Sequence, residues 1–171
     1  MSKYLVTGGS GFIGSHIVDR LCENPNNEVV VIDNESAVSN EKFYNNPLAE
    51  YHSFDIRDMD ACYPLFEGVD TVFHLAAFSR IQVAMQNPQA CIETNIQGTI
   101  NMLESARRWG VRRFVNSSTS SLYGLKNEPP LREDMPTDCL NHYSASKRSA
   151  EVMCQMYYNL YGLRTVTLRY F

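Results

Sequence analysis

Short apolar runs alternate with longer amphipathic stretches along the whole chain. Continuous apolar runs, such as the one at residues 28–33, are typical of strands that are buried on both faces. The stretches between these runs carry apolar residues at helical spacing, most clearly at residues 88–109. We therefore predict strands at residues 3–7, 28–33, 50–56, 71–77, 112–118 and 165–171, and helices at 12–23, 59–66, 88–109 and 143–161, with a loop at 125–140.

Strands that alternate with helices predict an α/β fold with a parallel sheet and helices on both of its faces. Six strands make a complete doubly wound sheet of the nucleotide-binding (Rossmann) type. A chain of 171 residues is long enough for a single core, so we expect one domain over residues 1–171.

Composition and charge exclude several classes of protein. The net charge of −4 gives no electrostatic footprint for nucleic acid or an anionic membrane. No apolar run of about 18 residues is present, so no membrane span is expected. Five scattered cysteines without a CxxC pair favour reduced thiols, and the histidines have no metal-ligand spacing. We therefore expect a cytoplasmic protein without a metal site, a nucleic-acid partner or a membrane partner.

A glycine-rich turn follows the first predicted strand. Gly9, Gly11 and Gly14 match G-x-G-x-x-G, and the set that starts at Gly8 matches G-x-x-G-x-x-G. Glycine permits the tight turn, and the missing side chains let the backbone approach a pyrophosphate at the helix N-terminus. Because the pattern lies between a strand and a helix, it predicts a dinucleotide site.

An acidic residue ends the second predicted strand. Asp33 lies where a carboxylate would hold the ribose hydroxyls of adenosine. It would repel a 2′-phosphate, and no Arg follows it closely, so the residues favour NAD over NADP. The alternative is an Asp that only caps a turn at the end of the strand.

Tyr143 and Lys147 lie four residues apart and share a helix face. A Tyr that acts as a base near neutral pH needs a pKa about 3 units below its usual value of about 10. Lys147 and an oxidised nicotinamide ring, both positive, would lower it. Thr119, after the fifth predicted strand, could orient the same substrate hydroxyl. Without this context, the two helix residues would be an anchor and a solvated charge.

Together the motifs resemble the extended short-chain dehydrogenase/reductase superfamily, and more narrowly its NAD-dependent nucleotide-sugar epimerase/dehydratase family. The resemblance covers the whole chain and rests on TGGSGFIG, DN at 33–34, DIRD at 55–58, HLAA at 74–77, NIQGT at 95–99, SSTSSLYG, YSASK and LRYF.

The resemblance implies a role for each matching position. The catalytic set would be Thr119, Tyr143 and Lys147, and the substrate would meet Ser79, Arg80 and Thr119. The implied NAD-binding residues are Gly8, Gly11, Phe12, Ile13, Gly14, Asp33, Asn34, Asp55, Ile56, Leu75, Ala76, Ala77, Asn95, Ser117, Tyr143, Lys147 and Phe171.

The residues after the catalytic Thr favour one reaction. Dehydratases of the family carry an Asp-Glu pair there, whereas this chain has Ser120 and Ser121, which are not strong acid–base groups. The resemblance therefore implies a nucleotide-sugar 4-epimerase that acts on a UDP-hexose. The alternatives are a dinucleotide-binding module without turnover, another nucleotide-sugar dehydratase or oxidoreductase, and a reductase that consumes its cofactor.

The resemblance implies that full-length members continue into a smaller substrate lobe. We expect that lobe to be missing from this chain, and therefore expect NAD binding with little or no turnover. Their dimers form through two long helices, which correspond to residues 88–109 and 143–161, so a homodimer is expected.

Overall fold

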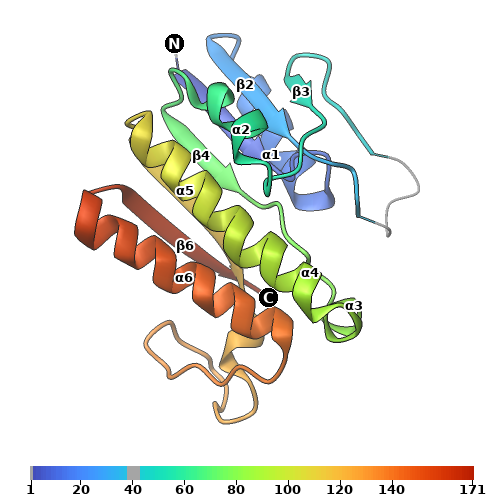
Figure 1. Ribbon diagram of the computed structural model, residues 1–171, viewed down its shortest axis with the longest axis vertical. Coiled ribbons are helices and arrows are strands. Elements are labelled where there is room, and N and C mark those ends of the chain that lie inside the picture. Colours follow the sequence, from blue (N-terminus) through green and yellow to red (C-terminus); the bar gives the residue numbers. More distant parts are fainter. Residues whose placement is uncertain (1, 38–42) are drawn as a thin grey trace.

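Six parallel strands form one sheet in the order β3-β2-β1-β4-β5-β6 (Figure 1). The computed structural model describes residues 2–37 and 43–171. This order confirms the predicted doubly wound sheet. Successive strands are added to one side of β1 up to β3 and then to its other side from β4 onward, so the strand order reverses between β1 and β4. The strands are β1 (Ser2–Thr7), β2 (Asn27–Ile32), β3 (Glu50–His52), β4 (Thr71–His74), β5 (Arg113–Thr119) and β6 (Arg164–Tyr170).

The longest helix, α6, shows how the sequence sets helix ends. Asn141 and Ser144 exchange hydrogen bonds in a capping box at its start, and Gly162 ends it in the left-handed conformation with φ of +72°. The helices are α1 (Phe12–Cys22), α2 (Met59–Cys62), α3 (Ile81–Gln86), α4 (Pro88–Ile92), α5 (Thr99–Arg108) and α6 (His142–Tyr161), with 3-10 helices at Tyr63–Phe66 and Ser120–Tyr123 and a π-helix at Glu93–Gly98.

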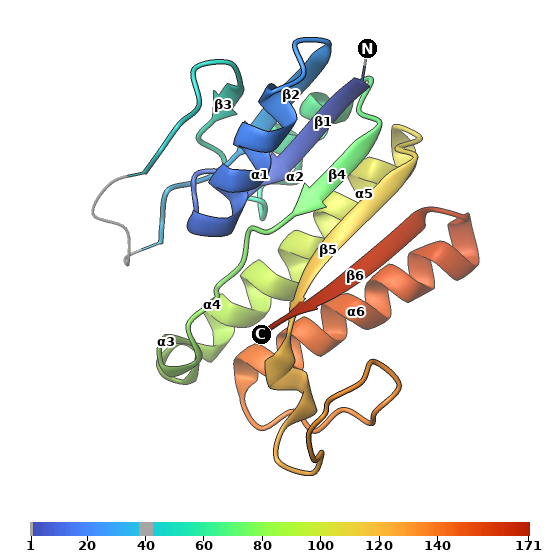
Figure 2. The same ribbon diagram turned by 180° about the vertical axis from the view of Figure 1, so that it is seen from behind.

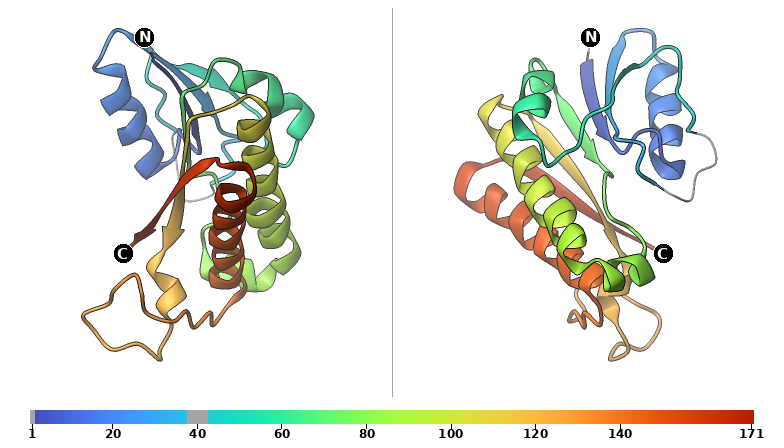
Figure 3. Two further views of the ribbon diagram at one scale, coloured as in Figure 1. Left: turned by 90° about the vertical axis from the view of Figure 1, so that its left-hand side faces the viewer. Right: turned by 45° about the vertical axis from the view of Figure 1, so that its right-hand side comes forward.

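The helices divide unequally between the two faces of the sheet. Figures 2 and 3 show α1 on one face and α2, α5 and α6 on the other. Neighbouring residues of β1 point to opposite faces, so Leu5 packs with Met102 and Phe114 under α5 and α6, whereas Val6 packs with Val18 under α1. Among the described helices, none is long and apolar enough to cross a membrane.

Two predicted strands are shorter than expected. The third was expected to reach residue 56, but it ends at His52, where the backbone turns and Phe54 donates its amide to the His52 carbonyl. The fourth was expected to reach residue 77, but it ends at His74. It leaves the ladder because the Ala76 amide donates to the Thr7 side chain instead of to a backbone carbonyl.

The predicted helix at residues 88–109 is divided. The π-helical turn Glu93–Gly98 separates α4 from α5, and π-turns of this kind occur often at functional sites. A short helix at Ile81–Gln86, for which no prediction was made, precedes it. Both features place side chains at the carboxyl end of the sheet.

Candidate active site

The glycine turn packs backbone directly against backbone. Gly8 has φ of +74° and donates its amide to the Ile32 carbonyl at 2.8 Å. A Cβ on Gly14 would lie 2.1 Å from the Gly8 carbonyl oxygen, so only glycine fits there. Gly11 precedes α1 without a side-chain cap, and Phe12 and Ile13 are exposed in the first turn. The turn therefore leaves the uncapped N-terminus of α1 open to an anion.

Asp33 is held against the glycine turn. Its Oδ2 accepts the Ser10 amide at 2.9 Å, and Oδ1 accepts the Glu35 amide at 2.8 Å. The predicted neighbour Asn34 donates to Asp55 Oδ2 at 2.9 Å. The Arg57 guanidinium beside Asp55 holds the pKa of that carboxyl below its usual range. The predicted ribose residues Asp33 and Asn34 and the predicted adenine residue Asp55 thus lie side by side beyond the end of β2.

The loop after β4 lies against the same turn. A Cβ on Gly8 would lie 2.7 Å from the Ala76 amide nitrogen, so the two backbones touch. Leu75 and Ala77 are half-buried beside it, and Ser79 and Arg80 are exposed where the loop enters α3. The structure therefore brings the predicted cofactor residues of this loop to the glycine turn, and leaves two predicted substrate residues, Ser79 and Arg80, exposed.

Asn95 connects three elements from inside the π-turn. Its Oδ1 accepts the Phe78 amide at 2.7 Å, and its Nδ2 donates to Ser146 Oγ at 2.9 Å. Gly98 ends the π-turn against Ile56, because a Cβ there would lie 2.5 Å from the Ile56 Cδ1 atom. Asn95 therefore connects the loop, the π-turn and α6, whereas Ile56 packs against the end of the π-turn.

The predicted catalytic set comes together at the carboxyl end of β5. Thr119 ends that strand, with a nearly buried side chain, and Tyr143 and Lys147 lie on the first turns of α6. Burial raises the pKa of Tyr143, although the neighbouring Thr119 hydroxyl lowers it. Burial also lowers the pKa of Lys147 to about 8. In the chain by itself, Tyr143 is thus not yet a base at neutral pH, and its expected lower pKa stays a prediction for the cofactor-bound protein.

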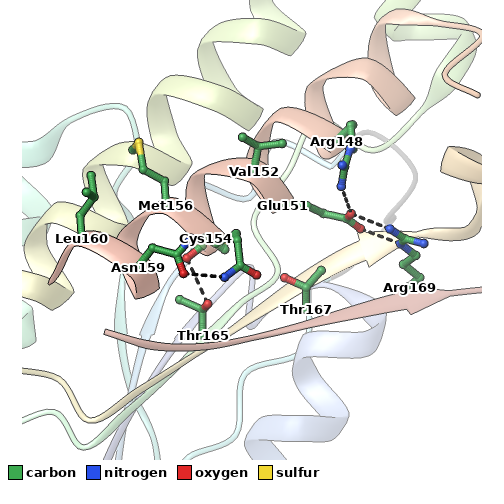
Figure 4. A pocket seen from close by; sticks show the side chains of 11 residues that line it. Arg148, Glu151, Val152, Cys154, Met156, Asn159, Leu160, Thr165, Thr167 and Arg169 are labelled. Carbon is green, nitrogen blue, oxygen red and sulfur yellow. Dashed lines mark hydrogen bonds and ion pairs between the residues drawn. The ribbon is translucent and has the colours of Figure 1, made fainter. Parts of the chain in front are cut away.

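A buried carboxylate, which the sequence did not reveal, anchors the helix that carries this set. Glu151 accepts a hydrogen bond from Ser118 Oγ at 2.7 Å. It also accepts from two nitrogens of Arg169, each at 2.9 Å, and from Arg148 Nη1 at 3.0 Å (Figure 4). Burial works against its charge, but the bonds from Arg169 and Ser118 outweigh it and lower its pKa. Its spacing from Lys147, one turn of α6, was the available signal for a residue on the buried face.

The end of β6 is attached to the same region. Ser117 Oγ lies 3.3 Å from the Tyr170 hydroxyl, and Phe171 stacks on Tyr123 with ring centroids 6.2 Å apart. A pocket of about 630 Å³ lies between α6 and β6, but its lining excludes the whole predicted catalytic set. The catalytic set therefore lies outside that hollow, at the carboxyl edge of the sheet.

These features fit a bound dinucleotide. The uncapped N-terminus of α1 has no acidic residue in its first turn, so nothing there repels a pyrophosphate. A Cβ on Gly11 would meet only the Gly8 carbonyl oxygen, at 3.3 Å, which leaves that position open. Within residues 2–37 and 43–171, no group of three or more His, Cys, Asp or Glu side chains is placed to hold a metal ion.

A doubly wound sheet with this turn and a Tyr–Lys pair near a Thr is the arrangement of the short-chain dehydrogenase/reductase class. A family model described as GDP-mannose 4,6 dehydratase matches residues 5–171. The UDP-glucose 4-epimerase of Streptococcus mutans is 38% identical over 170 residues, which are 98% of this chain and 50% of that protein.

Solved structures agree. A UDP-glucose 4-epimerase from Thermotoga maritima, solved with UDP-glucose, has a TM-score of 0.91 and 33% identity over 98% of this chain and 55% of that one. The UDP-glucose 4-epimerase of Thermus thermophilus, solved in complex with NAD, has a TM-score of 0.89 and 33% identity over 98% and 54%. The chain belongs to the extended short-chain dehydrogenase/reductase family of nucleotide-sugar epimerases and dehydratases, and it spans about half the length of the curated relatives it matches.

Proposed function

We propose that the chain is the NAD-binding and catalytic part of a nucleotide-sugar 4-epimerase that acts on a UDP-hexose. One observation carries the proposal: Thr119 meets Tyr143 at the carboxyl edge of the sheet, with Lys147 buried one turn further along α6. The same edge bears the open glycine turn, which is where ligands bind in doubly wound sheets.

The residues that would hold the cofactor surround the switch point between β1 and β4. The glycine turn and the α1 N-terminus would hold the pyrophosphate, and Asp33 would hold the adenosine ribose. Ile56 would flank the adenine, and Ala76 would line the dinucleotide after β4. Bound NAD would supply a reversible hydride acceptor for the carbon that carries the sugar 4-hydroxyl.

Each catalytic side chain then has one task. Tyr143 takes the proton of the 4-hydroxyl, and Thr119 holds that hydroxyl in line for the transfer. The Lys147 ammonium favours the phenolate form of Tyr143 by its positive charge. Epimerisation would follow if the 4-keto sugar turned within the site, so that the hydride could return from bound NAD to the opposite face of C4 while Tyr143 returns the proton to the 4-oxygen.

The residues after Thr119 favour epimerisation over loss of water. Ser121 donates its amide to Thr119 Oγ1 at 3.1 Å, so Thr119 caps the 3-10 helix at Ser120–Tyr123. Neither Ser120 nor Ser121 can supply the strong acid and base that a dehydratase needs beside its Thr. The nearby carboxylate, Glu151, is engaged by two arginines and is not free to act as an acid.

We also propose that two copies associate in the cytoplasm through the helices at residues 88–109 and 143–161. Support comes from apolar side chains that these helices leave exposed, and a monomer in sedimentation at micromolar concentration would contradict it. Those side chains are Ile92, Val152, Met156, Leu160 and Tyr161.

The experiment is to incubate the purified protein with NAD and UDP-galactose and to identify the products by NMR. Because the chain spans about half the length of its relatives, we expect at most slow conversion to UDP-glucose, without net formation of reduced cofactor. Tyr143→Phe should abolish conversion and leave NAD binding largely intact. The matched control is Tyr158→Phe, an exposed tyrosine on the same helix, which should behave as the wild type.

Three other results would contradict the proposal, each in its own way. A 4-keto-6-deoxy sugar would identify a dehydratase. Cofactor consumed in step with product would identify a reductase. NAD binding without any product, and without reduction of the bound NAD by UDP-galactose, would identify a dinucleotide-binding module.

A further inference from the structure

A histidine that the proposed mechanism does not use lies between the glycine turn and the π-turn. His74, at the end of β4, is 1% exposed, and both of its ring nitrogens have partners. Nδ1 lies 2.7 Å from Thr7 Oγ1, and Nε2 lies 2.9 Å from Thr99 Oγ1. A fully buried imidazole that is satisfied on both sides is more than a space-filling ring.

The directions of these hydrogen bonds follow from counting protons. The Thr99 hydroxyl donates its one proton to the Asn95 carbonyl at 2.7 Å, so it can only accept from His74. The imidazole proton is therefore on Nε2, and Nδ1 accepts from the Thr7 hydroxyl. The Thr7 oxygen in turn accepts the Ala76 amide at 3.2 Å. One directed chain thus runs from Ala76 to Asn95.

Each end of this hydrogen-bond series reaches a different part of the candidate site. At one end, Ala76 touches Gly8, the first residue of the glycine turn. At the other end, Asn95 donates to Ser146 Oγ at 2.9 Å, and Ser146 immediately precedes Lys147 on α6. The hydrogen-bond series therefore connects the loop that would hold the cofactor with the helix that carries Tyr143 and Lys147.

This series of hydrogen bonds requires an uncharged imidazole. Burial, aided by the nearby Lys147 charge, lowers the pKa of His74 to about 3. A proton on Nδ1 as well would force the Thr7 hydroxyl to accept there, and its own proton would lose its partner. The neutral ring with its proton on Nε2 is the one form that satisfies every member of the chain.

We propose that His74 is a positioning residue, whose directed hydrogen bonds hold the loop at Ala76 against the glycine turn and in register with the π-turn and α6. The role in cofactor binding rests on the proposed function, whereas the role in holding the loop does not. Thr99 lies on α5 and is remote from the glycine turn in sequence. Its hydroxyl should nevertheless determine how well the Ala76 amide is protected from hydrogen exchange.

The test compares Thr99→Val, which keeps the shape and removes the hydroxyl, with Thr99→Ser, which keeps the hydroxyl. Thr71→Val is the matched control, because Thr71 is a buried threonine at the opposite end of β4. Two measurements use the cofactor-free protein: hydrogen exchange at the Ala76 amide, and the position of the His74 ring proton by NMR. A third measures NAD affinity by calorimetry.

We expect the wild-type ring to carry its proton on Nε2. Thr99→Val should speed exchange at Ala76 and weaken NAD binding, each by about tenfold, the scale of one lost buried hydrogen bond. Thr99→Ser and Thr71→Val should both stay close to the wild type.

A wild-type proton on Nδ1 overturns the proposal whatever the variants do. Unchanged exchange at Ala76 in a folded Thr99→Val protein overturns it too, as does an equal change in Thr71→Val. Failure of the wild type to bind NAD would instead contradict the proposed function. The exchange and ring-proton measurements would still decide whether the hydrogen bonds of His74 hold the loop.

Discussion

Replacing Lys147 by Met should make the cofactor-free protein more stable at neutral pH. The Lys147 side chain is 4% exposed, and no carboxylate within the described residues forms an ion pair with it. A buried charge without an ion-pair partner is destabilising, and a proposed functional residue can retain it at the expense of stability. Met keeps a similar length and carries no charge, so the substitution isolates the ammonium group.

The magnitude follows from the pKa of the ammonium group. Burial lowers that pKa from 10.5 to about 8, and one pKa unit corresponds to about 1.4 kcal/mol. Below pH 8 both the folded and the unfolded chains hold the proton, so the folded protein bears the whole cost, up to about 3 kcal/mol. Between pH 8 and 10.5 only the unfolded chain keeps the proton, and the stability of the wild type rises relative to Lys147→Met.

The assay is urea unfolding of both proteins without cofactor at a series of pH values from 7 to 10. We expect Lys147→Met to gain about 3 kcal/mol in unfolding free energy at pH 7, and the gain to shrink steadily above pH 8. Lys126→Met is the control, because the Lys126 side chain is 78% exposed and should show no such pH dependence. Equal stability at pH 7, or a gain that does not change with pH, would refute the reasoning.

Three further predictions test the geometry of the site. Tyr143→Phe should lower turnover by about 10²-fold or more, the usual contribution of a proton-transfer group, and a turnover assay that finds less than a tenfold loss would count against its role. Glu151→Gln should lower the unfolding free energy by about 3 kcal/mol in urea titration, because the buried Arg contacts lose their charged acceptor. Asp134→Asn, in an exposed pair, should change it by less than about 0.5 kcal/mol, and equal losses would contradict the assignment. Gly98→Ala should cost about 1–3 kcal/mol through its clash with Ile56, and a double-mutant cycle with Ile56→Val should recover part of that loss rather than add to it.

Much of the framework follows from local patterns in the sequence. The six strands, the glycine turn after β1 and the long helix α6 were all predicted, because each depends on residues close together in the chain. The Tyr143–Lys147 pair was predicted to share a helix face, since positions four apart always do. Motifs carried by one turn or one helix can therefore be recognised before any tertiary structure is known.

Contacts between distant segments were decided only by the tertiary structure. Glu151 meets Ser118 and Arg169 across sequence separations of 33 and 18 residues, and no local pattern marks such partners. The π-turn at Glu93–Gly98 lies inside a stretch that the sequence predicted as one continuous helix, and no local signal marked it.

His74 illustrates the physical reason most clearly. In the sequence, His74 is one residue of the strand predicted at 71–77, and nothing near it in the chain marks its partners. Its ring joins Thr7 and Thr99, which lie 67 and 25 residues away. Periodicity indicates which face of a helix or strand is buried. The hydrogen-bond partners of a side chain and the depth of its burial depend on how the elements pack, and these two properties determine the protonation states of the site.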